Sequence, residues 1–138
     1  MSQFENRLVA VMNKAVEPGK VMNALAHMCI GFGSELGKEN LELMDYVDSS
    51  ENIYPNISKM PFIVLRANSS KINWLRKEAI NNNIKYSVFT ETMTIGTWED
   101  QKSKTAETPE EEMIYYGIAL FGDIRIVSEI TRKFSLWK

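Results

Sequence analysis

The sequence predicts an α/β fold in which helices cover both faces of a mixed four- to five-stranded sheet, giving a three-layer α/β/α sandwich. The first observation behind this prediction is that short, continuously apolar segments alternate with segments whose apolar residues recur every three or four positions. The second is that two successive predicted strands, late in the chain, are joined by a polar loop and not by a helix. One strand is therefore expected to run antiparallel.

The first strand is predicted at residues 8–12, where apolar side chains follow one another without interruption. A connection containing Pro18 leads to a helix from about Gly19 to Gly33 or Gly37, because apolar residues recur at spacings of four, three and four. The inward stripe of this helix contains Val21, Leu25, Met28 and Phe32.

Residues 38–61 are predicted to form an irregular surface insertion. The pattern at residues 41–47 is compatible with a short edge strand. Residues 48–56 are polar and contain the serine, asparagine and proline residues that are typical of turns. Two interpretations of this segment stay open, a plain surface loop and a mobile loop over a site.

A second buried strand is expected at residues 62–67, and Ser69 or Ser70 is predicted to cap the helix that follows it. This helix begins at Lys71 and ends in an asparagine-rich turn at residues 81–83, because asparagine tolerates the left-handed conformation that stops helices.

A third strand is predicted at residues 84–93, followed by a polar loop that reaches residue 108. Residues 113–121 form the most hydrophobic run of the protein and are expected to be a central strand. Asp123 is predicted to cap a last helix that continues to Leu136.

The bulk composition describes an ordinary globular domain. A chain of 138 residues, 44% of them hydrophobic, is expected to fold as a single domain over residues 1–138. The net charge of −2 provides no overall positive field for nucleic acid, so RNA binding would need a local basic patch. One cysteine and one histidine favour neither a disulfide nor a zinc site, and no apolar run is long enough to span a membrane. We expect a cytoplasmic protein without metal, cofactor or membrane partner.

Polar side chains that suit a binding site follow two of the predicted strands. Lys20, Asn23 and His27 share one face of the first helix. A cation in the first turn opposes the positive end of the helix dipole, and the conflict is relieved if an anion binds there. If the first and third strands are parallel, a second set meets these residues at the same edge of the sheet. The second set is Thr90, Glu91 and Thr94.

In such a pocket Lys20 would hold an anion, Asn23 and the threonines would form hydrogen bonds, and His27 would orient the ligand or exchange a proton. Each residue also has a purely structural interpretation. Lys20 and Glu91 are then solvated surface charges, His27 is a hydrogen-bonded structural histidine, and the threonines follow strand propensity. The sequence contains no Ser-His-Asp order, phosphate-loop pattern, HExxH or CxxC motif.

Three stretches of the chain resemble the type II peptidyl-tRNA hydrolases. Residues 9–33 give a strand, a Gly-Lys pair at a helix start and a histidine seven positions after the lysine. Residues 62–94 give a strand, a helix, an asparagine-rich turn and a strand ending in threonines. The last stretch is Gly-Ile-Ala-Leu-Phe-Gly at 117–122, followed by residues 130–133. A closer likeness is to an uncharacterised bacterial family with this fold, which shares the Asn23-Ala24 pair.

The resemblance implies a peptidyl-tRNA hydrolase II-like fold and cleavage of the ester between a peptide and its transfer RNA. The matching catalytic residues are Lys20, His27 and Thr94. Two positions depart from the hydrolase pattern, which has a glutamine at Ala24 and an aspartate at Thr90. A hydroxyl lacks the charge of a water-orienting carboxylate, and the neighbouring Glu91 would point to the opposite face of a strand.

We therefore expect a small anionic or nucleotide-like ligand to bind a polar pocket at the carboxyl ends of the strands. Two alternatives stay open. The protein is a peptidyl-tRNA hydrolase with transfer RNA as its partner, or it is a non-catalytic interaction module that forms a homodimer through the first helix.

Overall fold

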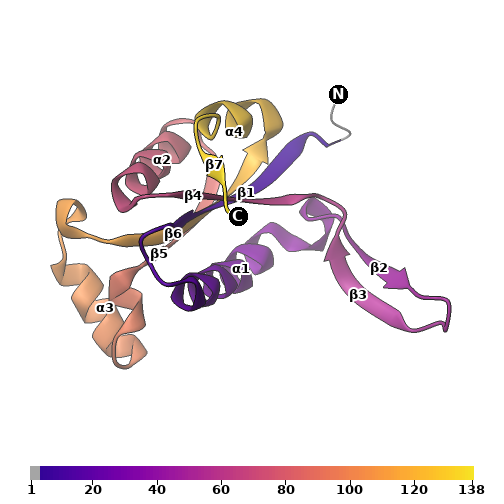
Figure 1. Ribbon diagram of the computed structural model, residues 1–138, viewed down its shortest axis with the longest axis horizontal. Coiled ribbons are helices and arrows are strands. Elements are labelled where there is room, and N and C mark those ends of the chain that lie inside the picture. Colours follow the sequence, from indigo (N-terminus) through magenta and orange to yellow (C-terminus); the bar gives the residue numbers. More distant parts are fainter. Residues whose placement is uncertain (1–3) are drawn as a thin grey trace.

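The computed structural model describes residues 4–138 (Figure 1). Its main sheet consists of β1 (Asn6–Asn13), β4 (Phe62–Ala67), β5 (Lys85–Thr90), β6 (Tyr115–Asp123) and β7 (Ser135–Leu136). The strands lie in the order β5-β6-β1-β4-β7. β1 and β4 are parallel, whereas β6 is antiparallel to both β1 and β5, and β7 is antiparallel to β4. The prediction of a mixed sheet of four to five strands is confirmed.

Helices cover both faces of this sheet. They are α1 (Pro18–Asn40), α2 (Ser69–Asn81) and α4 (Ile124–Ile130), whereas α3 (Trp98–Glu107) packs on the turn at residues 91–94 and covers neither face. α1 lies against one face, and α2 and α4 lie side by side against the other (Figure 1). The arrangement is therefore α/β/α.

The alternation of side chains along β1 divides the core in two. Val9 and Val11 belong to the cluster under α2 and α4, whereas Ala10 and Met12 belong to the cluster under α1. All four side chains are buried, with at most 1% of their surface exposed. A strand buried on both faces needs apolar residues at every position, which is why this segment reads as a continuous apolar run.

Three helix ends differ from the sequence-based expectation, and the first is that of α1, which continues past Gly33 and Gly37 to Asn40. The cap of α2 is Asn68, whose Oδ1 accepts a hydrogen bond from the backbone N–H of Lys71, whereas the hydroxyl oxygen of Ser69 accepts one from the Tyr115 N–H. Asp123 caps α4 as predicted, but this helix ends at Ile130 and not at Leu136. The chain leaves the helix because the residues that follow pair with the free edge of β4, with Leu136 opposite Leu65.

Residues 38–61 contain a regular hairpin where an irregular insertion was expected. β2 (Leu43–Val47) and β3 (Ile53–Ser58) pair in antiparallel fashion as a separate two-stranded sheet that projects from the body (Figure 1). The turn is organised by Asp48, whose Oδ1 accepts hydrogen bonds from the N–H groups of Ser50 and Asn52. We refer to residues 43–58 as the ribbon.

α3 lies inside the segment that was expected to be a polar loop. Thr97 and Asp100 form a reciprocal capping box, in which each side chain accepts a hydrogen bond from the other residue's backbone N–H. None of the side chains of α3 is buried. The helix therefore lacks the periodic apolar residues by which helices are recognised in a sequence, and its capping box is the signal that remains.

Gly37 changes the direction of α1 before the chain enters the ribbon. Its backbone angles are φ 81° and ψ 165°, whereas the residues on either side are helical. This conformation is accessible to glycine and strained for any residue with a Cβ atom.

We predict that Gly37→Ala lowers the free energy of unfolding by about 1–3 kcal/mol, because alanine would be held in a conformation that favours glycine. Urea denaturation measures the change. The matched control is Gly31→Ala in the regular part of α1, where an added Cβ meets no atom within 4 Å. This control should raise stability by up to about 1 kcal/mol through helix propensity. Equal effects of the two substitutions would contradict the assignment of strain to Gly37.

Candidate functional site

The two predicted sets of polar residues lie near one another in the fold. Because β1 and β5 each pair in antiparallel fashion with β6, they run in the same direction and end at the same edge of the sheet. α1 crosses this region, and the ring of His27 stacks on that of Phe89 with 5.7 Å between centroids. The first helix and the end of β5 are thus in contact.

The three helical residues are open to solvent. Lys20, Asn23 and His27 are all exposed on α1. Within residues 4–138, the Lys20 and Asn23 side chains make no hydrogen bond or ion pair. They form a polar stripe and not a closed pocket.

The structure does not bring Thr90 to this stripe. Phe89 packs in the cluster under α1, and the next residue along the strand, Thr90, pairs with Tyr115, which packs in the cluster on the opposite face. The buried Thr90 hydroxyl shares a 2.7 Å hydrogen bond with that of Thr92, which shares another of 2.7 Å with Thr105 of α3. Thr90 therefore takes part in an internal chain of hydroxyls that attaches α3 to the body.

The other two downstream residues lie in the 3-10 turn η1 (Glu91–Thr94). The side chain of Glu91 is exposed, and its backbone N–H donates to the carbonyl of Ile114. The Thr94 hydroxyl donates a 2.6 Å hydrogen bond to the Glu91 carbonyl. The Thr94 hydroxyl is thus used within the turn, whereas the Glu91 carboxylate is open to solvent.

A cavity of about 560 Å³ lies elsewhere, between α2 and the segment that follows α4. Lys14, directly after β1, and Ala67 and Asn68, at the end of β4, form part of its lining. The backbone N–H of Lys14 donates to the carbonyl of Ala67 at 2.9 Å, so the two strand ends are held together at this point. None of the six predicted site residues lines the cavity.

The topology explains why a cavity opens here. β1 and β4 are adjacent and parallel, but the helix after β1 covers one face of the sheet and the helix after β4 covers the other (Figure 1). The two connections diverge from neighbouring strand ends. In open α/β sheets this arrangement creates the crevice in which ligands bind.

The cavity concentrates positive charge in a protein whose net charge is −2. Its basic side chains are Lys14, Arg66, Lys71, Arg132 and Lys133. Two carboxylates, those of Glu78 and Glu129, also line it, and Glu129 pairs with Arg132 at 3.5 Å. The other four basic residues form no ion pair with any carboxylate in residues 4–138. The local potential therefore favours an anion.

Two aromatic rings add a flat apolar surface to the same cavity. The rings of Trp74 and Phe134 are stacked, with 6.3 Å between centroids and 26° between planes. Trp74 keeps 48% of its surface exposed, so one part of this pair is accessible from the cavity. Trp74 follows Lys71 by one helical turn on α2, and Glu78 follows Trp74 by another.

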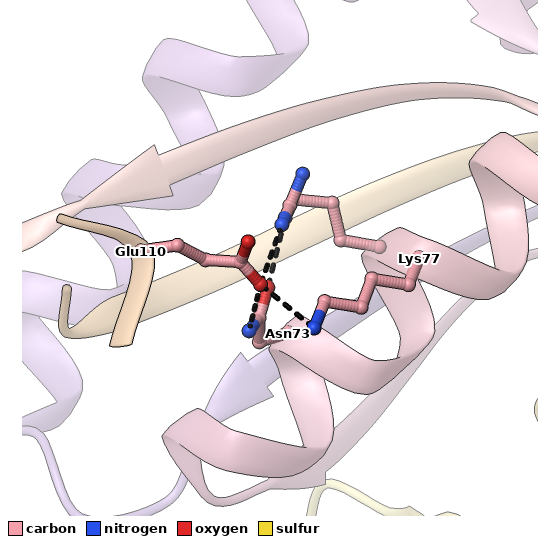
Figure 2. Close-up of polar contacts among 4 residues, drawn as sticks. Asn73, Lys77 and Glu110 are labelled. Atoms are coloured by element: carbon pink, nitrogen blue, oxygen red, sulfur yellow. Dashed lines mark hydrogen bonds and ion pairs between the residues drawn. The ribbon is translucent and has the colours of Figure 1, made fainter. Parts of the chain in front are cut away.

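The opposite side of α2 is held by Glu110, from the turn that precedes β6 (Figure 2). Its Oε2 accepts a 2.8 Å hydrogen bond from Asn73 and lies 2.9 Å from Lys77 Nζ and 3.1 Å from Arg76 Nη2. The hydrogen bonds from Asn73 and Lys77 hold the pKa of Glu110 at about 2, below its ordinary value of 4.5. This contact fixes the helix whose other face lines the cavity.

The sequence missed the cavity residues, although two signals were present. Lys14 directly follows the first strand, and Lys71 lies in the first turn of the second helix, which is the pattern that singled out Lys20. The contributions of Arg132 and Phe134 had no such signal, because they depend on the pairing of β7 with the distant β4.

The described residues give two further findings. No helix in residues 4–138 is long and apolar enough to cross a bilayer. Over the same range, no group of three or more His, Cys, Asp and Glu side chains is arranged to hold a metal ion.

Fold and cavity together define a three-layer α/β domain with a cationic crevice at the junction of two parallel strands. Residues 6–138 match the family described as "Protein of unknown function (DUF2000)", and the chain belongs to this family. The expected likeness to an uncharacterised family is thereby confirmed.

Several solved chains have a similar fold. One of them is a protein of unknown function from Agrobacterium tumefaciens, with a TM-score of 0.83 and 19% sequence identity over 99% of this chain and 100% of that chain. At this identity the likeness concerns the fold alone. No functionally curated protein matches the sequence.

We predict that acid weakens the attachment of Glu110. Because its pKa in the folded state is lowered, its contribution to stability is complete above the ordinary value of 4.5 and is lost as the pH falls toward 2. Urea denaturation between these pH values should show a smaller pH dependence for Glu110→Gln than for the unsubstituted protein, and carboxyl NMR should place the Glu110 midpoint near 2. Identical pH dependence of the two proteins would contradict this account.

Proposed function

We propose that this domain binds a small anionic, nucleotide-like ligand in the cavity at the carboxyl ends of β1 and β4. The observation that carries the proposal is the combination, in one crevice, of four basic residues without carboxylate partners and a stacked aromatic pair. The volume of about 560 Å³ lies in the range of cavities that hold small organic ligands.

The anionic group of the ligand would lie at the end of the cavity near Lys14 and Lys71. Lys71 is in the first turn of α2, where backbone N–H groups and the helix dipole also favour a negative charge. Lysine side chains at such a position bind phosphate as point charges without demanding one geometry.

A planar ring would stack on Trp74, one helical turn further along α2. Phe134 stacks on the tryptophan, so the ligand ring would take a part of Trp74 that Phe134 leaves exposed. Stacking on an aromatic side chain contributes about 1–3 kcal/mol per base and accepts many ring types. This part of the cavity therefore favours aromatic anions over inorganic ones.

The carboxylates of Glu78 and Glu129 give the cavity polarity from one end to the other. They would repel a ligand that is negative throughout and would accept hydrogen bonds from its hydroxyl or amino groups. A phosphate, a ring and a set of donors, in that order, are the features of a nucleoside monophosphate.

The peptidyl-tRNA hydrolase alternative has one supporting observation, the open stripe of Lys20, Asn23 and His27 beside the end of β5. The position of the hydrolase aspartate, however, holds the buried hydroxyl of Thr90, which is bonded to Thr92. Turnover of an N-acyl-aminoacyl-tRNA that is lost in Lys20→Ala would favour this alternative, and no turnover at high enzyme concentration would remove it.

Calorimetric titration with adenosine monophosphate and with inorganic phosphate tests the proposed ligand site. Lys71→Ala should weaken binding of both anions about tenfold to a hundredfold, because a hydrogen bond to a charged group contributes about 1.5–3 kcal/mol. Trp74→Ala should weaken binding of the nucleotide by a similar factor and leave phosphate binding unchanged.

The control is Lys102→Ala, which removes the same charge from exposed α3, outside the cavity. It should leave both affinities within about twofold of the original values, since its charge is screened from the cavity by solvent. The proposal is wrong if Lys102→Ala has the same effect as Lys71→Ala, or if neither anion binds at millimolar concentration.

A further inference from the structure

α1 is apolar on the face that it turns away from the sheet. Its inner side buries Val21, Ala24 and Met28. Met22 and Ile30, on the outer side, leave 67% and 72% of their surface in solvent, with Ala26 between them. These exposed apolar side chains lie beside the polar stripe of Lys20, Asn23 and His27, and nothing in the described part of the chain covers them.

The ribbon carries a second uncovered apolar face. Tyr46 stands opposite Tyr54, and Met44 stands opposite Ile57, so these four side chains share one face of the two strands. The two tyrosines leave 51% and 52% of their surface exposed, and Ile57 is also exposed. A two-stranded hairpin is marginally stable by itself in water unless a further layer packs on it.

The geometry of the ribbon is fixed before any partner arrives. The hydroxyl of Tyr54 donates a 2.8 Å hydrogen bond to Asp48, the residue that organises the turn. At the other end, Leu41 packs beneath the ribbon with Phe32 and Leu36 of α1 in the core. A surface that is already ordered loses little conformational entropy when it binds.

The two surfaces differ in charge. Residues 42–58 contain the four acidic residues Glu42, Asp45, Asp48 and Glu51 and no lysine or arginine. Residues 18–34 of α1 contain one charged side chain, Lys20, and the end of the helix adds Glu35, Lys38 and Glu39, so α1 as a whole is neutral. The negative charge of the ribbon disfavours contact of ribbon with ribbon and leaves the neutral apolar face of α1 as the better partner for it.

We propose that both surfaces are covered by a second copy of this chain. The ribbon of one copy lies across the outer face of α1 of the other, and two-fold symmetry makes the same contact twice. Within one chain the two surfaces do not cover each other, as their exposure shows, and the ribbon projects away from the body (Figure 1). The pairing is independent of the cavity, whose lining shares no residue with either surface.

Contact size sets the expected strength. A strand of six residues is about 20 Å long, so two such contacts form an interface at the small end of specific ones. We expect a dimer that dissociates at micromolar concentrations.

Sedimentation equilibrium from about 1 to 500 µM tests the dimer. The unsubstituted protein should approach the mass of two chains at the upper end of this range. Ile30→Glu, on the helix, and Ile57→Glu, on the ribbon, should each raise the dissociation constant at least tenfold, because each places a carboxylate in an apolar contact. The control is Ile80→Glu, which changes an exposed isoleucine of α2 outside both surfaces. It should dimerise like the unsubstituted protein.

Melting temperatures and circular dichroism test whether each variant is folded. If Ile30→Glu does not fold, Met22→Ser replaces it on the helix side, and if Ile57→Glu does not fold, Tyr46→Ser replaces it on the ribbon side. The proposal requires loss of the dimer from both the helix side and the ribbon side. It is overturned if the unsubstituted protein is monomeric throughout, if substitutions on one surface alone dissociate the dimer, or if Ile80→Glu dissociates it equally.

Discussion

The burial of β1 on both faces, between a parallel neighbour and an antiparallel one, is the constraint on which the other features depend. Its side chains fill the core on either side, and its backbone pairs with β4 from Leu8 to Asn13 and with β6 from Asn6 to Met12. The chain leaves its end through Asn13, whose buried side chain donates to the carbonyl of Tyr115 and accepts from the N–H of Ala15. α1 follows this exit and covers one face of the sheet, whereas α2 follows β4 and covers the other face. A crevice therefore opens between the ends of the two strands.

Charge is distributed unevenly around this frame. The acidic residues gather on the ribbon and on the turn before β6, whereas the ends of β1 and β4 and the segment after α4 bring basic residues together. A protein with a net charge of −2 therefore has both a positively charged cavity and a negatively charged ribbon. Composition does not reveal this distribution, because the electrostatic potential at a site depends on which side chains the fold assembles.

The elements that could be predicted are those in which the pattern of apolar residues within one segment indicates how that segment is buried. Continuous apolar runs predicted β1 and β4, and the three- to four-residue spacing of apolar side chains predicted α1 and α2. α3 gave no such signal because it buries none of its side chains, and β7 gave none because its two residues are defined by pairing with β4. The left-handed Asn83, with φ 56°, agrees with the predicted turn after α2.

The difference between local patterns and long-range pairing also explains which parts of the candidate site could be predicted. Helical spacing places Lys20, Asn23 and His27 on one face, and this spacing can be seen in the sequence alone. The face that Thr90 occupies depends on strand register, and the pairing of β5 with β6 shifts between Phe89 and Thr90. The cavity joins residues from positions 14, 66–78 and 129–135, and no local pattern connects segments so far apart.

The most direct test of the central claim, that the functional crevice lies at the ends of β1 and β4, is an amide NMR titration with adenosine monophosphate. The account predicts that the signals of Lys14, Asn68 and Lys71 shift together and saturate at one ligand concentration, while those of Lys20 and Thr94 stay in place. Shifts confined to Lys20, His27 and Thr94 would contradict it and would place the site on the outer stripe of α1.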